Sequence, residues 1–278
     1  MATIRELKKR LQGVKATRQL TGAMRTVSSA KYARLSSSLE AYRPYAQACR
    51  DMVRAVGGLP ADTPRDDGED MIVLIAGNRG LCGGYNSELI SMFLSEADVY
   101  GGTQLFVVCG KVAAEACREK GISVYREFSL SDEPTFTEAA ELSRFLCDLY
   151  SRGEVRSVRF LIQKFRNMLV QVPSFRDFLP VGSGGHDTPP DTELIFEPDA
   201  DTVLDSLRRQ CLDADVYSVL LECACGAQAA TLTAMRSAYD NAGRSAAALE
   251  LDINRRRQSE VTSNVIETAS ENRSNGEW

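Results

Sequence analysis

The 278-residue chain has little of what membrane-spanning and histidine-dependent proteins need. It has one histidine, one tryptophan and no run of about 18 apolar residues that would cross a bilayer. Residues 1–6 lack the apolar stretch of a signal peptide, so we expect the mature chain to begin here. His186 lies in a Gly- and Pro-rich segment, which favours a solvated loop over zinc binding or acid–base catalysis. The 44% hydrophobic and 26% charged residues are typical of a soluble, folded chain.

The eight cysteines are scattered along a chain that has no export signal. This distribution favours reduced thiols in a reducing compartment over a disulfide framework. Cys223 and Cys225 come closest to a metal-binding pattern, but they lie in a helical stretch, where positions two apart point away from each other. We therefore expect no metal site and no bound cofactor.

Charge is unevenly distributed along the chain. Residues 1–56 contain twelve basic and three acidic residues, a formal charge of +9, while the whole chain carries -5. A basic segment on an acidic body suggests an acidic partner: nucleic acid, an anionic membrane surface or a protein. A simply solvated helix face is an equally good interpretation of this segment alone.

Apolar residues at alternating spacings of three and four run along both ends of the chain. They extend from Ile4 to Val14, from Leu35 to Val56 and from Val216 to Ile253. The spacing predicts a helix over 3–56, roughly 80 Å long, and a matching helix at the carboxyl end. The economical arrangement is an antiparallel coiled coil made from both termini. The polar stretch 15–25 should then face something other than this partner helix.

The middle of the chain alternates short strand-like and helix-like segments. The expected strands are 71–76, 105–109, 122–128 and 155–164, with 168–172 and 175–179 as a further hairpin arm. The expected helices are 87–100, 112–120 and 135–151, and another helix begins near Asp201. This order predicts a mostly parallel sheet covered by helices, a Rossmann-like α/β domain inserted into the coiled coil. The predicted domains are an amino-terminal helix over 1–56, the α/β domain over 57–215 and a carboxyl-terminal helix over 216–278.

Two segments invite a chemical interpretation. Residues 77–86 form a Gly-rich turn after the first strand, but neither G-x-G-x-x-G nor the Walker A spacing fits, so a turn that permits close packing is favoured. Cys82 in this turn has no nearby candidate base, which argues against a nucleophile. Residues 255–257 are three consecutive arginines, which point in three directions on a helix. They are either solvated or surrounded by acceptors.

Several segments of the chain carry a specific resemblance, and they follow one another in a fixed order. They are 4–31, 79–86, Phe196-Glu197-Pro198-Asp199, Ala234-Met235, Asp240-Asn241-Ala242 and Arg257-Gln258. In sequence and order they resemble the gamma subunit of F-type ATP synthases. The resemblance implies a central rotor shaft that turns with the ion-driven membrane ring and forces the catalytic beta subunits through different conformations. It implies no catalysis by the chain itself.

The resemblance also implies partners and contact residues. Contacts with the beta subunits of the alpha–beta catalytic hexamer fall on Met24, Arg25, Arg255, Arg257, Gln258 and Thr262. Contacts with the c-ring of the membrane sector and with the epsilon subunit fall near Phe196 and Glu197. A single copy in a hetero-oligomer is implied, without nucleic acid or direct membrane insertion. The implied location is peripheral, on the cytoplasmic side of a bacterial inner membrane.

The chain also departs from the family's pattern. Gly22 stands where lysine is usual, and Asn78 where aspartate is preferred. Gly226, Ala227 and Thr231 replace a usual Ser-Glu pair and an arginine, and the last residues, 270–278, are polar rather than small and apolar. These positions put some helix contacts in question and suggest a divergent member.

Two other classes of function remain open from the sequence. A Rossmann-type nucleotide-binding enzyme would explain residues 71–128 but leaves both long helices without a role. A basic coiled-coil nucleic-acid binder would explain the +9 segment, although the acidic remainder argues against it.

Overall fold

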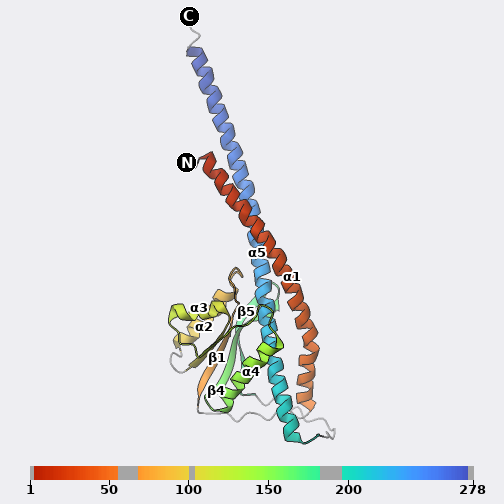
Figure 1. Cartoon of the computed structure of the whole chain (residues 1–278). Coiled ribbons are helices and arrows are strands. Elements are labelled where there is room, and N and C mark those ends of the chain that lie inside the picture. Colours follow the sequence, from red (N-terminus) through yellow and green to blue (C-terminus); the bar gives the residue numbers. More distant parts are fainter. Residues whose placement is uncertain (1–2, 56–67, 100–103, 182–195, 275–278) are drawn as a thin grey trace. The chain divides into compact units, whose positions relative to one another are not determined.

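The computed structural model describes residues 3–55, 68–99, 104–181 and 196–274. Figure 1 shows the helices and strands of the chain, which divides into two compact units. Residues 1–27 and 234–278 form one, here called the terminal unit, and residues 28–233 form the other, the central unit.

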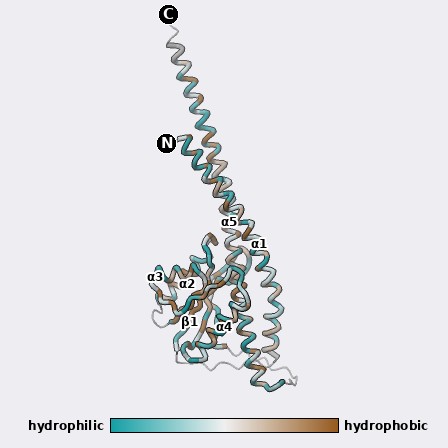
Figure 2. Tube along the Cα trace, in the orientation of Figure 1, coloured by the Kyte–Doolittle hydropathy of each residue, from teal (hydrophilic) through white to brown (hydrophobic). Residues whose placement is uncertain are grey.

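Two long helices confirm the predicted helical ends of the chain. Helix α1 spans Ile4–Ala55 and helix α5 spans Ala200–Ser274. Helix α1 starts with a reciprocal cap, in which the Thr3 amide donates to Glu6 Oε2 at 2.7 Å and the Glu6 amide donates to Thr3 Oγ1 at 3.3 Å. Figure 2 shows hydrophilic and hydrophobic residues alternating along both helices, as expected of helices with one buried face.

The central unit contains one five-stranded sheet, ordered β3-β2-β1-β4-β5. The strands are β1 (Glu69–Ile75), β2 (Gln104–Cys109), β3 (Arg126–Phe128), β4 (Val155–Asn167) and β5 (Val170–Leu179). Strands β1 to β4 are parallel to their neighbours and β5 is antiparallel to β4. The predicted mostly parallel sheet is confirmed. The predicted hairpin arm of 168–172 with 175–179 is wrong, because these residues form one continuous strand, β5, which pairs with β4. Pro173 is tolerated within β5 because that strand lies at the sheet edge.

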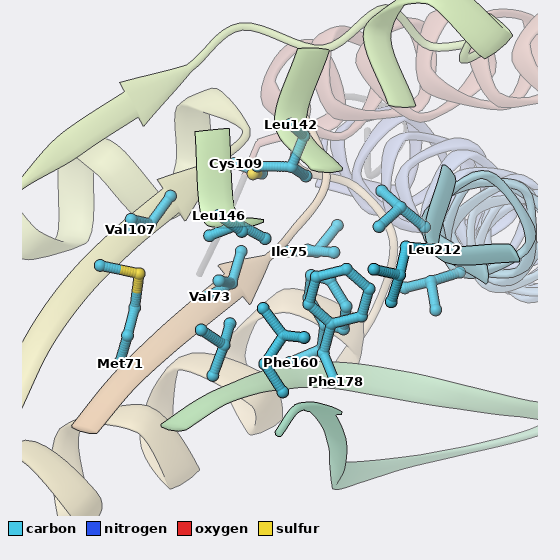
Figure 3. Packing of buried hydrophobic residues seen from close by; sticks show 14 of the residues in the cluster. Met71, Val73, Ile75, Val107, Cys109, Leu142, Leu146, Phe160, Phe178 and Leu212 are labelled. Carbon is cyan, nitrogen blue, oxygen red and sulfur yellow. The ribbon is translucent and has the colours of Figure 1, made fainter. Parts of the chain in front are cut away.

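Helices cover both faces of this sheet. Helices α2 (Tyr85–Val99) and α3 (Lys111–Lys120) pack on one face. Helix α4 (Phe136–Ser151) and the first part of α5 pack on the other. Figure 3 shows that second face, where Met71, Val73, Ile75, Val107, Cys109, Leu142, Leu146, Phe160, Phe178 and Leu212 meet. Successive residues of each strand point to opposite faces of the sheet. Because helices bury both faces, these strands are apolar without interruption.

The third strand is shorter than its apolar run suggests. The run 122–128 predicts a strand, but only Arg126–Phe128 pairs with β2. Gly121 ends α3 in a left-handed conformation, and the Ile122 amide donates to the Cys117 carbonyl, so the chain is still turning there. Ile122 and Val124 pack against the core without joining the sheet.

In the central unit, α1 packs antiparallel against α5. The Tyr42 and Tyr217 rings meet edge to face at 4.7 Å, and Tyr42 donates to the Ala214 carbonyl. Leu35 packs near Leu221, so residue numbers rise along one helix as they fall along the other. The predicted coiled coil from both termini is confirmed for this part of the pair.

Candidate functional site

The two helices also run antiparallel in the terminal unit. The Lys15 ammonium lies 2.6 Å from the Glu250 carboxylate. The buried residues along this part of the pair are Leu7, Thr21, Met235, Ala242, Ala246 and Ile253. The small side chains Ala242 and Ala246 on α5 let the two backbones approach closely.

An aromatic ring between two arginines is the most specific contact in the terminal unit. The guanidinium carbons of Arg18 and Arg25 lie 4.7 and 4.6 Å from the centre of the Tyr239 ring. Between them, a Cβ on Gly22 would meet that ring at 3.2 Å. The prediction that residues 15–25 face something other than the partner helix is therefore wrong for these three residues. Polar side chains can form the contact between two helices when arginines stack on an aromatic ring.

Tyr239 does not stand out by spacing, because it lies within the periodic apolar run from Val216 to Ile253. It is nevertheless the single aromatic residue within 226–250. Gly22, a departure from the family pattern, provides the space that this large ring occupies on α1. The two unusual residues are thus parts of one contact.

The predicted contact residues of the long helices lie in the terminal unit, in two separate groups. Met24 and Arg25 on α1 are half-buried. Arg255 begins the second group on α5, sixteen residues beyond Tyr239, which is about 24 Å along a helix. The structure therefore places these residues on one unit without bringing them into a single site.

The second group lies on a stretch of α5 whose side chains are mostly exposed. Ile253 is the last buried residue there, and side chains 254–270 are exposed except for half-buried Arg256. Arg255, Arg257, Gln258 and Thr262 are all exposed, and the Thr262 hydroxyl donates to the Gln258 carbonyl at 2.8 Å. Large apolar side chains are exposed on the same stretch: Val261, Val265 and Ile266.

The remaining predicted contact residues lie in the central unit, just before α5. Phe196 is half-buried and Glu197 is exposed. Asp199 caps the helix that follows, because its carboxylate accepts from the Thr202 amide at 2.9 Å and from the Thr202 hydroxyl at 2.8 Å. The hydrogen bond from the Thr202 amide also holds the pKa of the Asp199 carboxyl below its usual value. This cap fixes where α5 starts relative to Phe196 and Glu197.

A cluster of polar residues ties α1 to the α/β layers within the central unit. The Lys31 ammonium lies 2.9 Å from Asp132, and Asn78 donates to the Leu130 carbonyl at 2.8 Å and to Asp132 at 3.3 Å. The Arg79 guanidinium lies 3.5 Å from the same carboxylate. The hydrogen bond from Lys31 lowers the pKa of Asp132 most. Asn78 suits this place because an amide can donate to Asp132, which an ionised carboxylate cannot.

The Gly-rich turn is closed by its own side chains and leaves no cradle for a phosphate. Asn86 accepts from the Gly77 amide at 3.0 Å and donates to the Arg79 carbonyl at 3.0 Å. Asn86 also donates to the buried Cys82 sulfur at 3.2 Å. Leu81 adopts a left-handed φ of 64° with its side chain 64% exposed. The interpretation of this segment as a close-packing turn is supported.

The place where a Rossmann fold binds its ligand is filled by the chain itself. Ligands of such sheets bind beyond the carboxyl ends of the strands at the switch point, here between β1 and β4. Tyr85 at this point donates to the Cys223 carbonyl of α5 at 2.9 Å, and Gln163 donates to the Tyr85 carbonyl at 2.9 Å. A Cβ on Gly226 would meet the Tyr85 ring at 3.3 Å, so this small residue permits the close approach. Burial raises the pKa of Tyr85, whose hydroxyl therefore remains a donor.

The eight free thiols are buried or half-buried. Cys223 packs toward the sheet and Cys225 toward α1, so the two point apart, as predicted. Burial raises the pKa of Cys225 to about 11 and that of Cys223 further. Within the described residues no group of three His, Cys, Asp or Glu residues is placed to hold a metal ion. His186 lies outside the described residues.

Three cations of the basic amino-terminal segment form ion pairs within the chain. The acidic partners come from later parts of the sequence, in the pairs Lys15–Glu250, Lys31–Asp132 and Arg34–Glu133. Arg18 and Arg25 stack on Tyr239. Part of the charge asymmetry seen in the sequence is thus balanced within the chain, which weakens the case for a nucleic-acid binder.

One helix, α5, has a stretch long and apolar enough to pass for a membrane span by length and composition, and 44% of that stretch is buried inside the structure. Packing against the sheet and against α1 explains its apolar character.

Comparison with known proteins agrees with this architecture. The family model described as ATP synthase matches residues 3–271. The "ATP synthase gamma chain" of Desulforamulus reducens is 34% identical over 276 residues, covering 96% of this chain and 97% of the relative. That of Rubrobacter xylanophilus is 30% identical over 283 residues, covering 97% of each chain.

Solved structures show the same fold. A chain of the Euglena gracilis mitochondrial ATP synthase, titled OSCP/F1/c-ring, superposes with a TM-score of 0.72 at 16% identity, covering 99% of this chain and 96% of that one. A chain of the Tetrahymena thermophila mitochondrial central stalk and ring gives a TM-score of 0.62 at 18% identity, covering 79% and 99%. The chain therefore belongs to the ATP synthase gamma-chain family, the non-catalytic rotor subunit of that complex.

Proposed function

We propose that α1 and α5 act together as the torque-transmitting shaft of a bacterial ATP synthase. One observation carries the proposal: the two ends of the chain pair antiparallel in both units. Pairing at many points along two helices resists unwinding, because each helix is held against rotation about its own axis by the other. Among the described residues of the pair, no group of three His, Cys, Asp or Glu residues is placed to hold a metal ion.

The exposed end of α5 is the surface proposed to meet the catalytic hexamer of alpha and beta subunits. Exposed cations attract acidic loops weakly and with little directional preference, about 0–1 kcal/mol for each surface pair. A shaft that must slide past several equivalent subunits needs contacts of this kind. Exposed Val261, Val265 and Ile266 beside them favour a surrounding protein sleeve over bulk water.

The proposed contact residues follow from this assignment. Met24, Arg25, Arg255, Arg257, Gln258 and Thr262 meet the beta subunits, and Phe196 and Glu197 lie near the c-ring and the epsilon subunit. The chain is present as a single copy, peripheral to the inner membrane on its cytoplasmic side. Family membership supports the complex as a whole, and the contact residues rest on the resemblance of the sequence motifs.

A paired substitution tests the proposal. Arg257→Ala with Gln258→Ala should reduce ATP-driven ion pumping into vesicles, because two side chains that meet the beta subunits are lost. Arg244→Ala is the matched control, since Arg244 is an exposed arginine of the same helix outside the proposed set. Equal pumping by the double variant and the wild type, in fully assembled complexes, would show that these residues are not contacts.

The alternative of a Rossmann-type nucleotide-binding enzyme is not supported. The switch-point crevice is occupied by α5, and the Gly-rich turn is closed by Asn86. Isothermal titration of the isolated chain with nucleotides should show no stoichiometric binding.

A further inference from the structure

We propose that Tyr239 is a positioning residue that holds Arg25 in the orientation in which it meets the beta subunits. The inference rests on the proposed function, which makes Arg25 a contact. It concerns a residue of the opposite helix that the sequence motifs do not assign. Gly22 contributes to the same contact, because its lack of a side chain leaves space for the Tyr239 ring.

The geometry brackets one ring between two cations. Arg18, Gly22 and Arg25 are spaced four and three residues apart, so they follow one ridge of α1. The Tyr239 ring meets this ridge at Gly22, with the guanidinium carbons of Arg18 and Arg25 at 4.7 and 4.6 Å from its centre. Arg18, before Gly22, and Arg25, after it, thus both stack on the Tyr239 ring.

Gly22 and Tyr239 depend on each other sterically. A Cβ at residue 22 would lie 3.2 and 3.3 Å from two ring carbons of Tyr239, tighter than ordinary van der Waals contact. Any side chain at this position would therefore press on the ring. The large residue on α5 therefore requires the smallest residue on α1.

Stacking restricts the arginine before any partner arrives. A free arginine on a helix surface samples many rotamers, and ordering them costs free energy on binding. Arg25 is half-buried against the ring, so the stacked rotamers are favoured while its N–H edge stays available for a carboxylate. The ring prepares the cation for contact without touching the partner.

The test compares two substitutions of Tyr239 in the whole complex. Tyr239→Leu keeps apolar bulk but removes the π face, and Tyr239→Phe keeps the face and removes only the hydroxyl. We expect Tyr239→Leu to lower ion pumping per ATP hydrolysed by about two- to fivefold, the population factor that a partly exposed cation–π contact supplies. We expect Tyr239→Phe to match the wild type. The melting temperature of each complex, measured in parallel, reports a merely structural role.

The second part of the experiment repeats the Tyr239→Leu comparison in an Arg25→Ala background. In that background Tyr239→Leu should have no further effect on pumping, because the residue acts through Arg25. Equal loss in both backgrounds, or a loss in Tyr239→Phe as large as in Tyr239→Leu, overturns the inference. Normal pumping by Tyr239→Leu with reduced pumping by Arg25→Ala overturns it too, but leaves the proposed contact standing. Normal pumping by Arg25→Ala removes the Arg25 contact and the inference together. If Tyr239→Leu does not assemble, Tyr239→Met takes its place with the same criteria.

Discussion

At the scale of single residues, polar side chains with several partners fix the geometry of the central unit. Asn86 holds two backbone groups of its own turn, and Asp132 holds Lys31 and Asn78, which are distant in the sequence. Their role follows from the cost of leaving a donor or acceptor unpaired where water is excluded.

Asn86→Ala should destabilise the isolated chain by about 2 kcal/mol, because the Gly77 amide and the Arg79 carbonyl lose their partner. Urea unfolding followed by circular dichroism measures the change. Ser87→Ala is the matched control: Ser87 is exposed and donates only to the Gly84 carbonyl, so its loss should cost about 0.5 kcal/mol or less. A similar effect of both substitutions would contradict the role given to Asn86.

The Lys31–Asp132 pair predicts a pH dependence. Since Lys31 lowers the pKa of Asp132, the stabilisation is present above the unfolded pKa of about 3.9 and is lost as the pH falls through the lower folded pKa. Asp132→Asn should therefore lower the free energy of unfolding at pH 7 by about 1 kcal/mol, a value limited by partial exposure. The gap between variant and wild type should close at acid pH.

Two observations would speak against this account of Asp132. One is a gap that stays constant from pH 7 to the acid limit of folding. The other is an equal loss in Glu127→Gln, whose carboxylate makes a longer, exposed pair with Arg118 at 3.4 Å.

At the scale of elements, periodicity predicted the helices and strands well, because burial of one face imposes a fixed spacing on any sequence. The bounds of α1, β1, β2, α3 and α4 agree closely with their apolar runs. The strand over 122–128 was overestimated, because a left-handed turn at Gly121 delays pairing. The contact of residues 15–25 with α5 could not be predicted from spacing. Arginines that stack on an aromatic ring leave no periodic pattern of apolar residues in the sequence.

The candidate site was less predictable than the fold. Family motifs pointed to residues such as Arg257 and Gln258, yet spacing alone contains no information about a partner subunit. Tyr239 and Asp132 become informative only when the residues opposite them are known. The division into domains at residues 56 and 215, like the contact residues, stays a prediction.

The two glycines of α1 in the terminal unit allow the ring contact to be measured. Gly13→Ala has open space around the new methyl group, so it should stabilise the chain by about 0.5–1 kcal/mol through helix propensity. Gly22→Ala gains the same propensity but presses on the Tyr239 ring, so its net effect should be near zero or destabilising. Thermal unfolding of both variants gives the difference. Equal stabilisation would mean that the ring does not rest on Gly22.

At the scale of the whole molecule, the chain combines an α/β layer structure with a helix pair and performs no chemistry of its own. A fold that elsewhere binds nucleotides here has its crevice filled by α5. Function then depends on rigidity and on surfaces, which is why the informative residues are helix contacts rather than acids, bases or ligands.

Rotation of the assembled complex tests the central claim most directly. A cysteine at exposed Lys120 can carry a bead, because burial raises the pKa of most native thiols and slows their labelling. With the catalytic hexamer fixed to a surface and ATP supplied, the account predicts continuous rotation of the bead in one direction. A bead that stays still while the same complexes hydrolyse ATP would contradict it.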